Sequence, residues 1–342
     1  AASDVYKRQE SLGVAGEAEK NRKKPDGVER LRQKERKTMK RMHRVSLIGL
    51  VLALAMVAAA CSSDDSADDT ATTTTTTVAE TTTTTEAAFD LTAAVDDYLA
   101  NIPEGFLAIG DVQVFKDGVE ASGALVVDVR EESEYAEGHI PGAVNIPIRE
   151  LTQNLDKIPT DRQVYIYCKS GFRAATSLAA LGLVGYDNVL SYKPGWNGWT
   201  EAGEEVSTEA TMAEVVGAPD IEPELFAAVD AYMTTIPEGF NSAGDAAKFQ
   251  EAASAGAFVL DVRTADEYAV SHLDGATNVD IRNLAKEIDM VPTDSNTLAY
   301  CGSGHRAAMS LPALAVLERA SSKAYGGTYD SLVEAGAPVA AS

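Results

Sequence analysis

Two seven-residue stretches of this chain share one pattern, in which a cysteine opens a loop of small residues and an arginine follows. They are residues 168–174 (CKSGFRA) and 301–307 (CGSGHRA). The chain has only three cysteines, so packing is a poor explanation for two of them at matching places. The pattern predicts paired thiolate active sites at Cys168 and Cys301.

The residues around each cysteine indicate how its loop is held. Residues 163–167 are apolar, β-branched or aromatic, which is typical of a buried strand, and residues 171–183 have the spacing of an amphipathic helix. Cys168 then lies at the carboxyl end of a strand and faces a helix N-terminus, where the loop N–H groups and the helix dipole favour a sulfur anion. We expect the loop residues to bind the substrate: Lys169, Ser170, Gly171, Phe172, Arg173, Gly302, Ser303, Gly304, His305 and Arg306.

The chain repeats itself at a constant offset of 133 residues. Asp-Val-Arg at 128–130 recurs at 261–263, and Cys168 recurs as Cys301. A further match joins residues 94–106 and 228–240, which both end in Ile-Pro-Glu-Gly-Phe. We therefore expect an α/β fold of two tandem domains, each a mostly parallel sheet with helices on both faces. The other expected elements are a strand at 124–129 and helices at 148–155, 281–288 and 304–317.

Together these motifs resemble the rhodanese family of sulfurtransferases. The resemblance rests on the Asp-Val-Arg motif, Glu-Tyr at 134–135, residues 139–147 (HIPGAVNIP) and the cysteine loops, and it covers roughly residues 89–204 and 223–337. It implies that sulfur passes from thiosulfate, 3-mercaptopyruvate or a similar donor to a loop cysteine, as a persulfide, and then to a thiophilic acceptor. No cofactor and no metal is expected. The resemblance also implies ion pairs that support the loops, formed by Asp128, Arg130, Asp261 and Arg263.

Related phosphatases and arsenate reductases are the nearest chemical alternative, because they also surround an oxyanion with a cysteine and an arginine. Those enzymes place five residues between the two. Here four residues separate Cys168 from Arg173, and four separate Cys301 from Arg306. The smaller ring suits a single extra sulfur atom, so the spacing favours sulfur transfer.

The two loops differ in ways that predict different donors. Lys169 makes the first loop more cationic, which should favour an anionic donor such as thiosulfate. The second loop, Cys-Gly-Ser-Gly, resembles that of mercaptopyruvate sulfurtransferases. If thiocyanate formation from thiosulfate and cyanide survived unchanged in Cys168→Ser, the preference for the first loop would be wrong.

Histidines and tryptophans near the motifs are expected to be structural. His139 and His272 follow the Glu-Tyr pairs, where the family uses this residue to pin a loop, and the four histidines of the chain form no ligand cluster. Trp196 and Trp199 close the first copy and are expected to pack. The second copy has Gly-Gly at 326–327 but no tryptophan, which leaves open what forms that wall of its pocket.

Charge separates the front of the chain from the rest. Residues 1–60 contain 14 Lys and Arg against 7 Asp and Glu, whereas the remainder contains 15 against 45. Such an acidic surface repels phosphate backbones, so nucleic acid is not an expected partner.

The pattern of residues 39–60 is that of a secretory signal. A basic start precedes the uncharged residues 45–60, which are fewer than the roughly 20 that a membrane span requires, and small residues lead into Cys61. This resembles a bacterial lipoprotein signal, which implies a lipid on Cys61 and a membrane anchor on the outer face of the bacterial cytoplasmic membrane; an uncleaved anchor is the alternative.

Residues 61–87 predict a flexible tether, because twelve of the sixteen residues at 70–85 are threonine. The expected boundaries are 1–38 for a non-native or mis-annotated extension, 39–60 for the signal peptide, 61–87 for the tether, 88–204 for the first rhodanese-like domain, 205–222 for the linker and 223–338 for the second domain.

Three hypotheses of function stay open at this point. The first is a catalytic sulfurtransferase, the second a persulfide-carrying or sulfur-sensing surface lipoprotein with little turnover, and the third a structural lipoprotein whose loops are relics. An exported location would also permit a disulfide between Cys168 and Cys301, but each loop is expected to hold its own sulfur.

Overall fold

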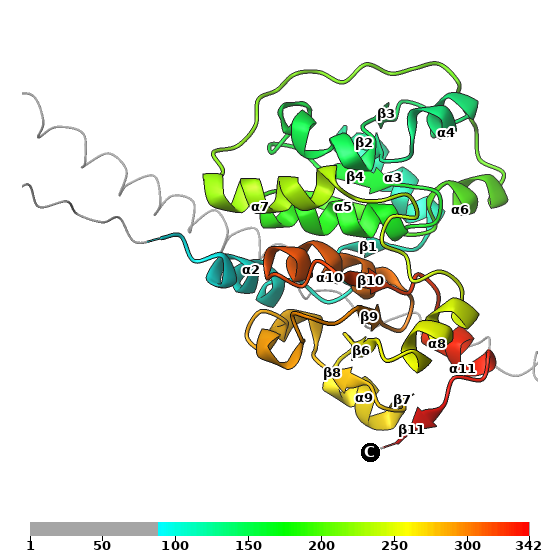
Figure 1. Ribbon diagram of the computed structural model, residues 1–342. Helices are drawn as coiled ribbons and strands as arrows, with labels where there is room; N and C mark the ends of the chain where they lie inside the picture. Colours follow the sequence, from blue (N-terminus) through cyan, green and yellow to red (C-terminus); the bar gives the residue numbers. More distant parts are fainter. Residues whose placement is uncertain (1–87, 342) are drawn as a thin grey trace, which may run out of the picture. The chain divides into compact units, whose positions relative to one another are not determined.

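The computed structural model describes residues 88–341, in which two copies of an α/β domain follow each other along the chain (Figure 1). The elements of the first copy are α2 (Leu91–Ala100), β1 (Ala108–Ile109), α3 (Val112–Ser122), β2 (Leu125–Asp128), α4 (Glu132–Glu137), β3 (Val144–Asn145), η1 (Ile148–Glu150), η2 (Thr152–Lys157), β4 (Val164–Tyr167), α5 (Phe172–Leu183), β5 (Val189–Tyr192) and α6 (Gly195–Glu201).

The second copy has nearly the same order, without a strand that matches β1 and with the additional strands β7 and β11. Its elements are α7 (Pro223–Thr234), α8 (Ala246–Ser254), β6 (Phe258–Asp261), α9 (Ala265–Val270), β7 (His272–Leu273), β8 (Thr277–Asn278), η3 (Ile281–Asn283), η4 (Ile288–Met290), β9 (Thr297–Tyr300), α10 (His305–Val316), β10 (Ser322–Ala324), α11 (Tyr329–Glu334) and β11 (Val339–Ala340).

A five-stranded parallel sheet of order β1-β5-β4-β2-β3 organises the first copy. Every residue of its central strand β4 is buried. Successive side chains point to opposite faces, so Tyr165 and Tyr167 join the core beneath α3 and α6, whereas Ile166 and Cys168 join the core beneath α5. Helices thus cover both faces of the sheet, and Cys168 lies on the α5 side.

The second copy repeats this plan with a four-stranded parallel sheet of order β10-β9-β6-β8. Tyr300 packs in the core beneath α8 and α11, and Cys301 joins the core beneath α10. A separate antiparallel pair, β11 with β7, completes this copy. The predicted fold class, two tandem domains with mostly parallel sheets, is therefore confirmed.

The two copies share one hydrophobic core, which contains residues of both α5 and α10. These helices pack against each other between the two sheets (Figure 1). Pro312 lies inside α10 and has no N–H to donate to the carbonyl oxygen of Ala308 one turn earlier. The hydroxyl of Thr176 on α5 donates to that oxygen over 3.3 Å, so one copy satisfies a backbone group that the other leaves free.

The predicted helices at 148–155 and 281–288 are wrong in type, because both segments consist of short 3-10 turns. In the first segment the side-chain amide of Asn154 donates to the carbonyl of Glu150 over 2.7 Å. That carbonyl would accept the N–H of residue 154 in an α-helix, and the backbone N–H of Asn154 instead bonds to Leu151. Short 3-10 turns are common in connections of this kind.

The segment predicted as linker, residues 205–222, contains no helix and runs beside the first copy. Ser207 pairs with His139, and the N–H groups of Val216 and Gly217 both donate to the carbonyl of Asp156. The predicted extension, signal peptide, lipidated Cys61 and tether lie outside the described residues. Between residues 88 and 341, no helix has the length and apolar character needed to cross a bilayer.

Candidate active site

Each cysteine directly follows the central strand of its sheet, at the position that the sequence predicts. β4 ends at Tyr167 and Cys168 follows; α5 begins at Phe172 after Gly171, whose φ is +87°. A side chain at this glycine would collide with the carbonyl oxygen of Lys193, so the turn requires glycine for both its conformation and its space.

The second loop is built in the same way. Cys301 follows β9, and Gly304, with a φ of +78°, precedes α10; a side chain there would collide with the carbonyl of Gly326. The first backbone hydrogen bond of this helix runs from the N–H of Ala308 to Gly304. The N–H groups between Cys301 and Ala308 are therefore not used by the helix and are available to an anion. The same holds after Cys168, where the first bond runs from Ala175 to Gly171.

The arginine of each loop is held by a glutamate from the Glu-Tyr motif. Arg173 donates to both carboxylate oxygens of Glu134 over 2.6 and 2.8 Å, and Arg306 donates to those of Glu267 over 2.6 and 2.7 Å. The hydrogen bond from Arg306 lowers the pKa of Glu267 to about 2, although partial burial acts in the opposite direction. Two-point binding of this kind fixes the plane of the guanidinium, so both arginines have a set orientation beside their cysteine loops.

The residues that the sequence predicts to support the loops form a buried ion pair in each copy. The guanidinium of Arg130 donates to Asp128 over 2.6 Å and to the carbonyl of Gly138 over 2.7 Å. Arg263 bonds to Asp261 over the same distance in the second copy.

An aromatic ring covers the arginine of each of these ion pairs. Trp196 stacks on Arg130 at 4.7 Å in the first copy, and Tyr329 stacks on Arg263 at 4.2 Å in the second. Tyr329 lies at the 133-residue offset from Trp196 and so covers the ion pair of the second copy, which has no tryptophan.

The two histidines of the repeated motif make backbone contacts. Both ring nitrogens of His139 lie within hydrogen-bond distance of carbonyl oxygens, those of Tyr135 at 2.9 Å and Glu209 at 3.1 Å. Its ring stacks on that of Tyr135, and His272 stacks on Tyr268 in the same manner. His139 therefore links its own copy to the connecting segment. In the described part of the chain, no group of three His, Cys, Asp or Glu side chains could hold a metal ion.

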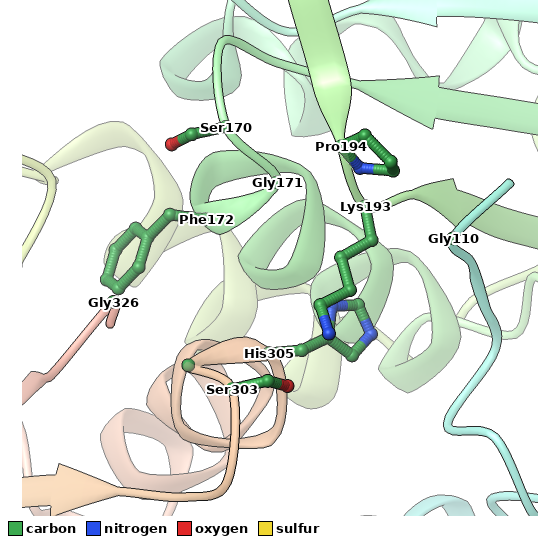
Figure 2. Close-up of a pocket in the computed structure, with 10 residues that line it drawn as sticks. Gly110, Ser170, Gly171, Phe172, Lys193, Pro194, Ser303, His305 and Gly326 are labelled. Carbon is green, nitrogen blue, oxygen red and sulfur yellow. The ribbon is translucent and has the colours of Figure 1, made fainter. Parts of the chain in front are cut away.

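The two loops meet at one cavity of about 260 Å³ (Figure 2). Both thiols are free, and their residues are almost fully buried, with exposed fractions of 1% for Cys168 and 0% for Cys301. The rims of the loops face the cavity, together with Lys193. The predicted loop residues among its lining are Ser170, Gly171, Phe172, Ser303, Gly304 and His305.

The other predicted loop residues lie elsewhere. Lys169 is exposed and lines neither this cavity nor the next one described. Gly302 lies beside the guanidinium of Arg306. A second cavity of about 500 Å³ adjoins the second loop, and both carboxylates and cations surround it. Its lining includes Glu104, Phe106, Lys193, Glu267, Arg282, Ser303, His305 and Arg306.

Lys193 lines both cavities, but nothing in the sequence indicates this, because the residue lies outside every repeated motif. Arg282 and Phe106 do carry a signal in the sequence, since they recur at matching places as Arg149 and Phe240. The repeat by itself does not assign them to the site, because it does not show which copy each residue contacts.

Comparison with known proteins identifies the domain. The family model described as "Rhodanese-like domain" matches residues 111–202 and 242–331. The chain is 39% identical over 79 residues to a protein named "Sulfurtransferase" from Allochromatium vinosum, a match that covers 23% of this chain and 74% of that protein. It is 30% identical over 83 residues to thiosulfate sulfurtransferase GlpE of Shewanella oneidensis, covering 24% and 82%.

Other matches are more partial. The chain is 33% identical over 90 residues to YrkF of Bacillus subtilis, a proposed sulfur carrier protein; this covers 26% of the chain and 49% of YrkF, or about half its length. Among solved structures, the 3-mercaptopyruvate sulfotransferase SseA of Escherichia coli matches with 20% identity and a TM-score of 0.33, covering 65% of this chain and 98% of that one.

Proposed function

Since the chain belongs to the rhodanese-like sulfurtransferase family, with two copies of the domain, we propose that it transfers sulfane sulfur through persulfides on Cys168 and Cys301. The observation that supports this most is the position of both cysteines. Each follows a central strand and precedes a helix N-terminus whose first N–H groups are free to bind an anion. Both copies keep this arrangement, so both are proposed to be active.

The proposed reaction has two displacements, and thiosulfate serves as the example of a donor. The cysteine thiolate attacks the outer sulfur of thiosulfate, the S–S bond breaks, and its electron pair leaves with sulfite. The enzyme then carries the persulfide Cys–S–S⁻. A thiophilic acceptor such as cyanide attacks the terminal sulfur, the second S–S bond breaks, and the cysteine thiolate returns as thiocyanate leaves.

The chain's own groups have defined parts in this scheme. The loop N–H groups and the helix N-terminus stabilise the negative charge on the thiolate and then on the persulfide. Arg173 and Arg306, held by their glutamates, place a further positive charge beside each loop. The cavity between the loops receives the donor and releases the product.

One observation favours a second function, in which the protein carries persulfide to a partner with little turnover on small donors. Both thiols are almost completely buried, which would protect a persulfide from solvent. The match to the proposed sulfur carrier YrkF points the same way.

Intact mass of the purified protein after incubation with thiosulfate tests both functions. One added sulfur atom per reactive cysteine, removed by cyanide, indicates the transferase; an added sulfur that resists cyanide indicates the carrier. Absence of any added sulfur would contradict both and leave the structural lipoprotein.

The location is a separate proposal that rests on residues 39–61 of the sequence. We propose export and a lipid anchor on Cys61, on the outer face of the bacterial cytoplasmic membrane, with a small sulfur donor and a thiophilic acceptor as partners. Labelled palmitate should enter the expressed protein and be absent from the Cys61→Ala variant. Incorporation that persists in the variant would contradict lipidation at this residue.

A further inference from the structure

The repeated segment Ile-Pro-Glu-Gly-Phe of each copy contacts an arginine of the other copy. Arg149 of the first copy donates from Nε to the carbonyl of Ile236 over 2.6 Å and from Nη2 to that of Pro237 over 2.9 Å. Arg282 of the second copy binds Ile102 and Pro103 in the same manner, over 2.8 and 3.0 Å. The two copies have therefore exchanged this segment reciprocally.

The phenylalanine that ends each segment reaches the arginine of the other copy's cysteine loop. The ring centre of Phe240 lies 4.7 Å from the guanidinium carbon of Arg173 and 4.8 Å from that of Arg149. Phe106 lies 4.9 Å from Arg306 and 4.4 Å from Arg282. These distances are within the range of cation–π attraction, so each ring contacts two arginines of the partner copy.

The backbone of both segments is held in a conformation that ordinary residues rarely adopt. Phe106 and Leu107 have φ values of +53° and +54°, and Phe240 and Asn241 have +58° and +57°. Two consecutive non-glycine residues in the left-handed region persist only where surrounding contacts hold them. The same strain at matching places, next to the same arginines, indicates that the position of each ring is specified by the fold.

We propose that each cysteine site is composite, and that Phe240 positions Arg173 for reaction at Cys168 while Phe106 positions Arg306 for reaction at Cys301. This rests on the proposed sulfur transfer. Each arginine is bound in its plane by a glutamate and covered by the partner copy's ring, so its charge stays directed at its own cysteine loop. Phe106 also lines the 500 Å³ cavity beside the second loop, where a donor would contact the ring.

The second site has one further tie of this kind. Nε2 of His305 lies 3.0 Å from the carbonyl oxygen of Phe106, so the segment from the first copy is fixed to the first residue of α10. The matching residue in the first copy is Phe172, which has no ring nitrogen to donate. The exchange is thus common to both sites, and the histidine bond strengthens it at the second.

A crossed experiment on the full chain tests the proposal. Cys301→Ser leaves only Cys168 among the loop thiols, and Cys168→Ser leaves only Cys301; Phe240→Leu and Phe106→Leu are placed in each background. Sulfur loading from thiosulfate is followed by intact mass. Phe240→Leu should slow loading of Cys168 about fivefold and Phe106→Leu should slow loading of Cys301 by a similar factor, because leucine fills the space but offers no π face.

Conservative variants separate positioning from simple packing. Phe240→Tyr and Phe106→Tyr keep the aromatic face and should restore most of the loading rate, whereas the leucine variants should not. Thermal unfolding of every variant checks that the fold is kept. The proposal is overturned if each phenylalanine affects the cysteine of its own copy, if both affect both cysteines alike, or if leucine serves as well as tyrosine.

A second measurement keeps this test apart from that of the proposed function. If neither parent accepts sulfur, the sulfur transfer itself is wrong, and the alkylation rate of the remaining loop cysteine by iodoacetamide still reports on the site. Phe240→Leu should then lower the alkylation rate of Cys168, and Phe106→Leu that of Cys301, because a less firmly positioned arginine stabilises the reactive thiolate less. If each phenylalanine variant instead changed the alkylation rate of the cysteine in its own copy, the proposal that the sites are composite would be wrong.

Discussion

At the first cysteine site, Arg149 forms an ion pair with Glu131 over 2.7 Å. At the second, Arg282 occupies the matching position, and the residue in place of the glutamate is Thr264. Within residues 88–341 no carboxylate lies at ion-pair distance from Arg282. At matching positions of the two copies, the charge of Arg149 is therefore neutralised by a carboxylate and that of Arg282 is not.

A second difference adds to the first. Lys193 lines both cavities, and the matching position in the second copy is Gly326, beside which the ring of Phe172 packs. Lys193 belongs to the first copy in sequence but faces the second copy's cavity. Among the cations that line these two cavities, the two without a carboxylate partner in the described chain, Lys193 and Arg282, thus lie at the cavity beside the loop of Cys301.

In this chain, a residue that belongs to one copy in sequence can line the cavity beside the other copy's cysteine loop, as Lys193 does. Lys169 favours the first loop as the place for an anionic donor when the loops alone are read, but its side chain is exposed. Of the charged residues that line the second cavity, Glu267 and Arg306 pair with each other, and the cations Lys193 and Arg282 have no carboxylate partner among the described residues and favour the second loop.

The largest expected effect comes from the cysteines themselves. Cys168→Ser with Cys301→Ser should abolish sulfur loading, since a hydroxyl cannot form a persulfide. Of the single variants, Cys301→Ser should lose more of the thiosulfate-dependent thiocyanate formation, because the uncompensated cations lie at the second site. Steady-state assays of the three variants decide this, and a greater loss in Cys168→Ser would restore the preference read from Lys169.

The contrast between His305 and Phe172 predicts a pH effect on stability. Burial, together with the charges of Lys193 and Arg306, lowers the pKa of His305 to about 4 against the hydrogen bond to Phe106 that raises it. In the unfolded chain the imidazole of His305 binds a proton near pH 6.5, whereas in the folded chain it stays neutral until about pH 4. The free energy of unfolding is therefore highest above pH 6.5 and falls as the pH drops toward 4.

The loss should be roughly 2–3 kcal/mol across that window. Denaturant unfolding of the native chain and His305→Phe at pH 7 and 4.5 measures it. The variant, which copies the first site, should lose less on acidification. An equal loss in both proteins would mean that other groups account for the pH dependence.

Exchange of the charged residues between the sites should shift donor affinity. In the Cys168→Ser background, Thr264→Glu and Lys193→Ala should each raise the half-saturating thiosulfate concentration for Cys301 about fivefold, as expected for loss of one partly screened charge. In the Cys301→Ser background, Glu131→Thr should lower that concentration for Cys168. Affinities that do not respond to these changes would contradict the charge contrast.

The smallest effect concerns the contact between the helices. Thr176→Val removes the hydroxyl that donates to Ala308 and should lower the free energy of unfolding by about 1 kcal/mol. Pro312→Ala gives that carbonyl its own helical donor, so Thr176→Val should cost less in the Pro312→Ala background. Denaturant unfolding of the four proteins in this cycle provides the measurement, and strict additivity would show that the hydroxyl does not serve this carbonyl.

Much of the fold follows from local pattern. The run ending at Tyr167 predicts a buried strand and the spacing after Gly171 and Gly304 predicts helices, which the structure shows to within a residue or two. The segments after Pro147 and Asp280 fold as 3-10 turns despite their helical spacing, and in the first the side-chain amide of Asn154 competes for the carbonyl of Glu150. Spacing alone carries no information about that competition.

The sequence by itself determined the duplication, the parallel sheets and the two cysteine loops at helix N-termini, since each depends on residues that are close in the chain or on a repeat that can be aligned. Only the tertiary structure decided that Phe106 covers Arg306 and Phe240 covers Arg173, and that Lys193 faces the second site. The repeat offset would be the same if each segment lay on its own copy. The packing of α5 against α10 brings the loops to one cavity and makes the exchange possible, and that packing is a property of the whole folded chain.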